Sequence, residues 1–244
     1  MKPHFEFFLS RHHEMGRDRL MRIPCICNYL EEAAGVHASA LGVGLEDLNE
    51  ESLSWVLVKM RLQLRRRPGP GERITVETWP VGVERLQFRR DFILYDDERR
   101  TLGTAVSQWV VMGLETRRVE RFPLRVTGLV PDNPRLAQET GDIRIPAVQN
   151  GRLGPAFPVR LADIDQNQHV NNCRYVDFAL ESAELAGMGD NPRQIDMLFR
   201  AEGLRGDVIH SVSAEEQNAP GTLVHSFFRK EDDRELARIR TVHD

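Results

Sequence analysis

The sequence has few cysteines, no long apolar run and no excess of positive charge. Its 3 cysteines cannot build a disulfide framework, and such scarcity is typical of a reducing compartment, so we expect a cytoplasmic protein. No stretch of about 18 apolar residues occurs, and therefore no membrane-spanning helix is expected. The N-terminal segment MKPHFEFFLSRHHEMGRD also lacks the unbroken apolar core of a secretory signal.

The charge balance excludes two classes of partner. Lysine and arginine number 33, and aspartate and glutamate number 37, so the formal net charge is −4. Because nucleic acids and anionic membranes are bound by basic surfaces, we expect neither as a partner. No glycine-rich phosphate loop and no zinc-ligand spacing occurs, so we expect no cofactor and no metal ion. The length of 244 residues allows one large domain or two of about 120 residues.

Hydrophobic periodicity predicts a helix and several strands in each half. Residues 23–38 repeat apolar side chains every three or four positions, with Pro24 in the first turn and a stop near Gly42. The predicted strands of the first half are 5–9, 53–64, 73–79, 85–95 and 102–112. The second half is predicted to contain strands 157–161, 194–199, 208–215, 222–229 and 235–242, and a helix at 170–187 whose buried side includes Leu185.

The order strand, helix, then antiparallel strands occurs twice, which indicates an internal repeat. Cys27 and Tyr29 match Cys173 and Tyr175 at an offset of 146 residues. We therefore predict an α+β double hotdog fold, in which each half wraps a curved antiparallel sheet around a central helix. The predicted halves are residues 1–112 and 151–244, joined by a proline-punctuated linker, 113–150.

Polar side chains crowd into the segment that precedes the second helix. Asp165, Asn167 and His169 alternate there, and the unpaired N–H groups of a helix start can stabilise an oxyanion. Capping of the helix by Asn171 and Asn172 is the alternative explanation for part of this polarity. We predict Asp165, Asn167 and His169 as catalytic residues.

This segment, Asp-x-Asn-x-His-Val-Asn-Asn-x-x-Tyr from Asp165 to Tyr175, resembles the acyl-[acyl-carrier-protein] thioesterases. Residues 28–34, 76–80 and 114–118 also resemble that family. The resemblance implies a thioester hydrolase of fatty acid biosynthesis that releases a fatty acid from acyl carrier protein. It also implies that the carrier is the protein partner, and we expect the enzyme to be a homodimer.

The same resemblance implies a second catalytic carboxylate in the C-terminal half, which we assign to Glu202. Plant-type members usually carry a cysteine directly after this glutamate, but the present sequence has Gly203. A cysteine nucleophile is therefore disfavoured, and we predict that a carboxylate activates water. Either Glu202 or Asp165 can be that general base.

The N-terminal half is predicted to hold the acyl tail. Subtracting 146 from the four catalytic positions leads to Arg19, Met21, Ile23 and Val56, none of which keeps the chemistry. The resemblance implies an apolar tunnel in this half, and the predicted wall residues are Trp55, Leu30, Ala34 and Met60. Ordinary core packing is the alternative for each of them.

Arginine clusters are candidates for docking the acidic carrier. They comprise residues 65–67 with 89–90, and residues 117–118 with 121. Solvated hairpin ends are the alternative explanation. Two other functions also stay open: an acyl-CoA thioesterase or a hotdog hydratase, and a non-catalytic acyl-binding module.

Overall fold

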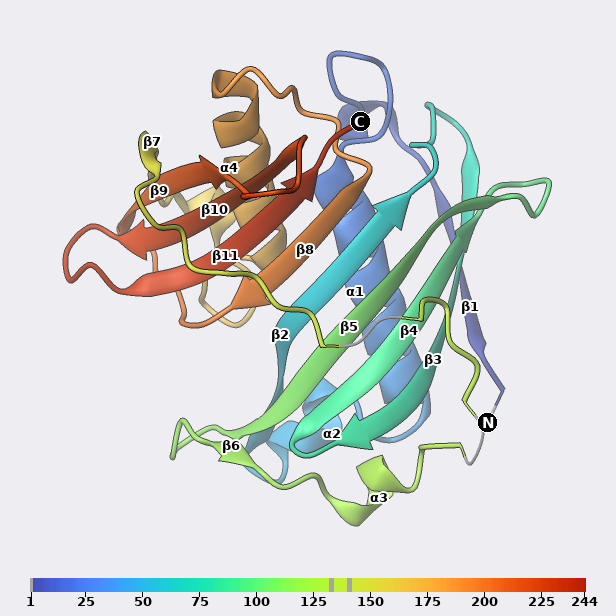
Figure 1. Ribbon diagram of the computed structural model, residues 1–244. Helices are drawn as coiled ribbons and strands as arrows, with labels where there is room; N and C mark the ends of the chain where they lie inside the picture. The colour runs from blue at the N-terminus through green and yellow to red at the C-terminus, as the bar shows by residue number, and fades with distance from the viewer. Residues whose placement is uncertain (1, 132–133, 140–141) are drawn as a thin grey trace. The chain divides into compact units, whose positions relative to one another are not determined.

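The structure is a computed structural model and describes residues 2–131, 134–139 and 142–244. The chain divides into two compact units, Met1–Gly141 and Asp142–Asp244. Figure 1 shows the elements of each unit along the chain. No helix among the described residues is long and apolar enough to cross a membrane.

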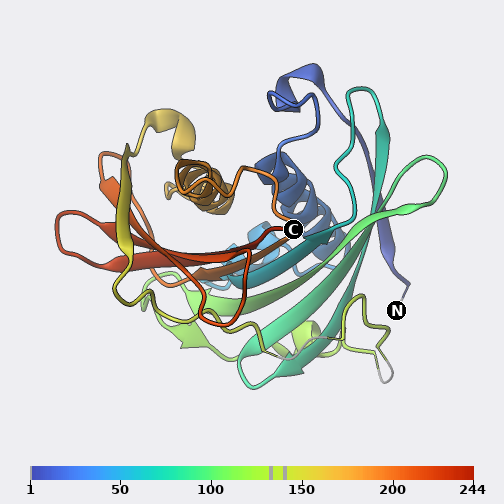
Figure 2. The same cartoon turned by 45° about the horizontal axis from the view of Figure 1, so that its top comes forward.

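The N-terminal unit is an antiparallel sheet curved around one long helix. The sheet order is β1-β3-β4-β5-β2, and β6 pairs with β5. Figures 1 and 2 both show the strands passing around α1. The elements are β1 (His4–Leu9), η1 (His12–Glu14), α1 (Ile23–Ala40), α2 (Leu45–Asn49), β2 (Leu53–Leu64), β3 (Arg73–Glu84), β4 (Gln87–Tyr95), β5 (Thr101–Gly113), β6 (Val119–Glu120) and α3 (Leu124–Thr127).

Helix α1 forms where the apolar periodicity predicts it. Pro24 lies in its first turn, where the missing N–H has no intrahelical partner to lose. Its buried stripe includes Ile26 and Leu30, which pack into the concave side of the sheet. The chain leaves the helix through Gly42, whose φ of 69° is a left-handed conformation that glycine adopts without steric cost.

The C-terminal unit repeats this plan with shorter strands. Its sheet order is β8-β11-β10-β9-β7, and α4 packs against β7, β9, β10 and β11. The elements are β7 (Arg152–Pro158), η2 (Leu161–Asp163), α4 (Asn172–Leu185), β8 (Gln194–Phe199), β9 (Val208–Glu215), β10 (Thr222–Arg229) and β11 (Glu235–Val242). The predicted α+β double hotdog fold is confirmed.

Three local predictions differ from the structure. The strand predicted at 157–161 ends at Pro158, because the chain turns into η2. Leu185 is 66% exposed, because it is the last residue of α4, although Phe178 and Ser182 on the same side of the helix are buried. Part of the predicted linker forms β6 and α3, while its residues 132–133 and 140–141 lie outside the described residues.

The repeat is present, but its register is not the one predicted. The isolated bridges Met15–Met21 and Ile164–Val170 correspond at an offset of 149. The stacked ring pairs Phe8–Tyr29 (centroids 4.1 Å apart) and Phe157–Phe178 (4.3 Å) have the same offset. The predicted offset of 146 is therefore wrong, and the shared cysteine and tyrosine are a coincidence of sequence.

After the helix the offset falls to 135. The hydrogen bond from Met21 N to Pro68 O (2.8 Å) corresponds to the bond from Val170 N to Gly203 O (2.8 Å). From the start of the helix to this loop, the N-terminal unit has 14 more residues than the C-terminal unit (Ile23 to Pro68 against Asn172 to Gly203), and they include α2. A single offset cannot align the two units, because this insertion changes the register.

Candidate active site

The polar segment before α4 forms a closed loop. Asp165 N donates to His169 O (2.9 Å), and Gln168, with φ 66°, reverses the chain. Asp165 Oδ1 accepts from the backbone N–H groups of Asn167 (2.8 Å) and His169 (3.3 Å). Asn167 lies exposed at the loop tip. The Asp165 carboxylate thus shapes the loop that presents His169.

The base of the loop is anchored by a buried carboxylate. Asp163, only 1% exposed, accepts from Arg160 through backbone N (2.8 Å), Nε (3.0 Å) and Nη2 (2.9 Å). These hydrogen bonds hold the pKa of Asp163 below its usual range. Asp163 O also accepts from Asn171 N (2.9 Å), which ties the anchor to the start of α4. Asp163 therefore links η2 to the start of α4.

Asn171 is the N-cap of α4, in agreement with the capping alternative, whereas Asn172 is the first residue of the helix. Its Oδ1 accepts from Cys173 N (2.8 Å), and its backbone O accepts from Arg174 N (2.9 Å). These bonds, with the bond from Val170 N to Gly203 O, occupy most donors near the helix start. The Asn172 N–H keeps no hydrogen-bond partner in the part of the chain that the structure describes.

The structure brings His169 together with Glu202. His169 Nε2 lies 3.1 Å from Glu202 Oε2, and their side chains are 27% and 40% exposed, so solvent and ligands can reach both. The bond from Val170 N to Gly203 O joins the two loops directly beside this pair. Of the four predicted catalytic residues, His169 and Glu202 form this pair. The Asp165 carboxylate accepts from the backbone of its own loop, and Asn167 is exposed on the same loop.

The four predicted tail-binding residues lie in the N-terminal unit. Leu30 and Met60 are fully buried, and Ala34 is 5% exposed. Trp55 is half-buried, and its Nε1 donates to Val43 O (2.8 Å). A cavity of about 480 Å³ in this unit is lined by other residues, namely Ser52, Leu53, Gly113, Glu115, Thr116, Glu120 and Arg121.

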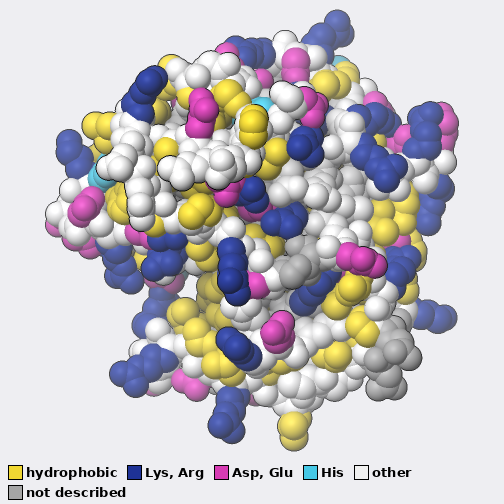
Figure 3. Space-filling view, in the orientation of Figure 1, with side chains coloured by type: hydrophobic (Ala, Val, Ile, Leu, Met, Phe, Trp, Pro, Cys, Tyr) yellow, Lys and Arg dark blue, Asp and Glu magenta, His cyan; other side chains and the backbone are white. Residues whose placement is uncertain are grey.

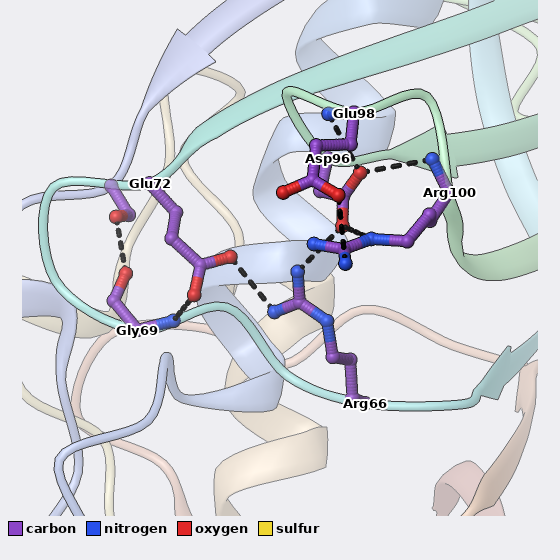
Figure 4. A network of polar contacts seen from close by, with 7 residues as sticks. Arg66, Gly69, Glu72, Asp96, Glu98 and Arg100 are labelled. Carbon is purple, nitrogen blue, oxygen red and sulfur yellow. Dashed lines mark hydrogen bonds and ion pairs between the residues drawn. The ribbon is translucent and has the colours of Figure 1, made fainter.

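Much of the larger predicted arginine cluster is buried or held in ion pairs, although Arg65 and Arg66 are exposed. Figure 4 shows Arg66 held between Glu72 (2.8 Å) and Asp96 (2.9 Å). Burial pushes the pKa of Asp96 up, but hydrogen bonds from Arg100 and Arg66 outweigh it and hold this pKa well below its usual range. Arg67 is buried in an ion pair with Asp18.

Two further arginines of that cluster are also occupied or buried, since Arg89 pairs with Asp91 (2.7 Å) and Arg90 is 4% exposed. By contrast, Arg117, Arg118 and Arg121 are exposed. Figure 3 shows basic side chains scattered beside acidic ones on the face in view, not gathered in one field.

The N-terminal unit carries the structural counterpart of the site without its chemistry. In the corrected register Asp165, Asn167, His169 and Glu202 correspond to Gly16, Asp18, Leu20 and Arg67. The imidazole–carboxylate pair is absent there, and Arg67 bonds instead to Asp18 and to Met21 O (3.3 Å). Glu14 repeats the anchoring role of Asp163, because its Oε2 accepts from Arg11 N (2.6 Å).

Two family models match the chain. The acyl-ACP thioesterase N-terminal domain matches residues 4–127, and the acyl-ACP thioesterase C-terminal domain matches residues 151–244. The chain belongs to the acyl-ACP thioesterase family. An oleoyl-acyl carrier protein thioesterase of Coriandrum sativum, described as chloroplastic, is 31% identical over 86% of the present chain. The chain spans only 62% of the length of that relative.

Solved structures share the fold over the whole chain. An acyl-ACP thioesterase from Bacteroides thetaiotaomicron is 25% identical, with a TM-score of 0.87 over 99% of this chain and 98% of that one. A 12:0-ACP thioesterase from Umbellularia californica superposes with a TM-score of 0.83 at 24% identity, covering 99% and 97%. Among the described residues of this acyl-ACP thioesterase family member, no group of three or more His, Cys, Asp or Glu side chains could hold a metal ion.

Sequence patterns did not reveal every group near the site. Arg229, at the end of β10, contacts the loop that carries Glu202 but lies 27 residues from it in sequence. No motif marks Arg229, because the contact arises only when β9 and β10 pair. Tyr175 is part of the sequence motif, but its contact is visible only in the structure: the hydroxyl is buried against Gly203 and has no hydrogen-bond partner among the described residues.

Proposed function

We propose that this protein hydrolyses the thioester of fatty acyl-[acyl-carrier-protein], releasing a fatty acid and the carrier thiol. The observation that carries the proposal is the pairing of His169 with Glu202 beside the start of α4. A carboxylate held against an imidazole, both accessible, can accept a proton from water. Membership of the acyl-ACP thioesterase family supplies the substrate class.

In the proposed reaction Glu202 acts as the general base. It takes a proton from water while the water oxygen bonds to the thioester carbon, and His169 orients the carboxylate. The Asn172 N–H donates to the oxyanion of the tetrahedral intermediate. Collapse of the intermediate breaks the C–S bond, and the proton held by Glu202 passes to the leaving thiolate. Asp165 is assigned to the loop, since its carboxylate accepts two backbone N–H groups.

The acyl tail is proposed to lie in the N-terminal unit, against Leu30, Ala34, Trp55 and Met60. Support comes from their position on the concave, apolar side of the curved sheet and on α1. Ala34→Phe fills space beside the helix and is expected to shift the preferred acyl chain to shorter lengths. Chain-length profiles with carrier-bound substrates measure this shift, and an unchanged profile places the tail elsewhere.

The carrier is proposed to dock on Arg118 and Arg121, which are exposed. Acidic partners are steered by such charges, and the effect weakens as salt rises. Replacing both arginines with glutamate is expected to raise KM for acyl-carrier substrates more than for acyl-CoA. An equal change with both substrates contradicts the docking role.

The remaining proposals concern compartment and assembly. None of the three cysteines, all of which the structure describes, forms a disulfide bond, which supports a reducing compartment such as the cytoplasm. We also propose a homodimer, which light scattering after size-exclusion chromatography tests directly.

The decisive experiment is thiol release from panels of acyl-carrier and acyl-CoA substrates. Glu202→Gln is expected to lower kcat by about 100-fold or more, because a neutral amide cannot accept the proton. Glu231→Gln, at an exposed carboxylate in the turn between β10 and β11, is the matched control and should keep the wild-type rate. Thiol release from acyl-CoA but not from acyl-carrier substrates supports a CoA thioesterase. Hydration of an enoyl thioester supports a hydratase, and tight binding without turnover supports an acyl-binding module.

A further inference from the structure

We propose that Arg229 is a positioning residue that holds Glu202 in place against His169. The inference rests on the proposed function, because it gives Glu202 the role of general base. Arg229 touches no reacting atom in this assignment and acts only through the loop that carries Glu202.

The contacts of Arg229 reach both ends of that loop. Its Nη2 donates to Glu202 O (2.7 Å), and its Nε donates to Asp207 Oδ2 (3.0 Å). Asp207 Oδ2 also accepts from Leu204 N (2.8 Å). One guanidinium thus fixes the residue that bears the base and the carboxylate that closes the loop behind it. The side chain is 15% exposed, so solvent competes little for these bonds.

The opposite side of the loop is held by the site itself. Gly203 O accepts from Val170 N (2.8 Å), which is adjacent to His169. Arg229 donates a hydrogen bond to the backbone carbonyl of Glu202, and Val170 N donates one to the carbonyl of Gly203, the following residue. Because both carbonyls are fixed, the Glu202 side chain starts from a defined backbone position at 3.1 Å from the imidazole. Loss of one of the two restraints frees the loop to rotate.

The competing explanation is that Arg229 only stabilises the fold. Its Nη1 donates to Asp232 Oδ2 (3.1 Å) in the turn after β10, which is a purely structural contact. Arg238 offers a matched control on the neighbouring strand. It is also 15% exposed, pairs with Glu235 (2.6 Å) and donates to a backbone carbonyl, that of Ile145 (3.0 Å). Arg238 therefore repeats the stabilising chemistry of Arg229 but makes no hydrogen bond to residues 202–207 itself. Its partner Glu235 also pairs with Arg200 (2.9 Å), which precedes that stretch.

The test compares Arg229→Lys with Arg238→Lys in the full chain. A lysine can still pair with a carboxylate, but one ammonium cannot match the three acceptors that the planar guanidinium serves. Both variants should lose similar thermal stability. Arg229→Lys should lower kcat about 10- to 100-fold with KM changed less than about twofold, because misplacing a catalytic group costs this much. Arg238→Lys should keep both constants within about twofold.

A double-mutant cycle with Glu202→Gln isolates the route of action. If Arg229 acts through Glu202, then Arg229→Lys adds no further loss once Glu202 is replaced. A kcat loss of equal size in both backgrounds, or one that Arg238→Lys reproduces, overturns the proposal. A Glu202→Gln enzyme as active as wild type contradicts the proposed function instead.

A second readout needs no turnover. In NMR spectra of protein with isotope-labelled histidine, the side-chain signal that is missing from the His169→Asn variant is assigned to His169. This signal should move in Arg229→Lys and in Glu202→Gln, because each disturbs the pair, and should stay in place in Arg238→Lys. A His169 signal that does not respond to Arg229→Lys overturns the positioning role even if the protein hydrolyses no thioester.

Discussion

Gly203 is the position at which one added methyl group tests the site most directly. A Cβ built on Gly203 would lie 2.7 Å from Tyr175 Oη and 2.9 Å from Val170 Cγ2. Both distances are shorter than van der Waals contact, so the loop, the tyrosine or both must move in Gly203→Ala. The neighbouring residue is Glu202, and the movement therefore changes the 3.1 Å contact with His169.

The expected cost follows from these contacts. Overpacking at a buried position destabilises proteins by about 1–3 kcal/mol. Displacing a catalytic group by about 1 Å lowers kcat about 100-fold. Tyr175→Phe removes the atom in closest contact, and this hydroxyl has no hydrogen-bond partner to lose. We therefore expect Tyr175→Phe alone to change stability by less than about 1 kcal/mol.

Urea unfolding and thiol release on the two single variants and the double variant form the assay. Gly203→Ala should lower both the free energy of unfolding and kcat. Adding Tyr175→Phe should restore part of both quantities in the double variant. Full recovery is not expected, because the contact with Val170 remains. A Gly203→Ala protein as stable and active as wild type would refute the proposed packing behind the base.

Three further predictions concern the C-terminal unit. Burial lowers the pKa of His225 to about 3, so the unfolded state binds more protons than the folded state between about pH 6.5 and 3. Between pH 7 and 5 the free energy of unfolding of the wild type should therefore fall by about 2 kcal/mol more than that of His225→Gln, measured by urea unfolding. Asp163→Asn should cost about 1–3 kcal/mol and lower kcat, because the amide keeps the backbone bond but loses the ion pair with Arg160; wild-type stability and thiol release would contradict the anchor. Leu185→Lys should change the free energy of unfolding by less than about 0.5 kcal/mol, since the side chain is exposed, and a larger thermal shift would contradict that exposure.

The fold was predictable because its signals are local. Alternation in residues 58–64 and the apolar stripe from Ile26 to Leu30 each follow from one element, and the structure has strand β2 and helix α1 at these places. Leu185 was mispredicted because a helical stripe continues in sequence after the sheet that covers it has ended. The Asp165–His169 motif located one loop of the site, but nothing local indicates which carboxylate faces the imidazole. That information lies in the pairing of distant loops through Val170 and Gly203.

The difference between the two units also depends on such distant pairing. Both units build the same loop, with the same bridge and the same left-handed residue before the helix, at Arg19 and Gln168. Where the C-terminal unit has Glu202, the N-terminal unit has Arg67, which is always protonated and cannot accept a proton from water. Asp18 satisfies part of its charge, so the loop geometry survives without the base. The two loops therefore share one backbone geometry, and the capacity to accept a proton from water depends on the side chain at the position of Glu202 or Arg67.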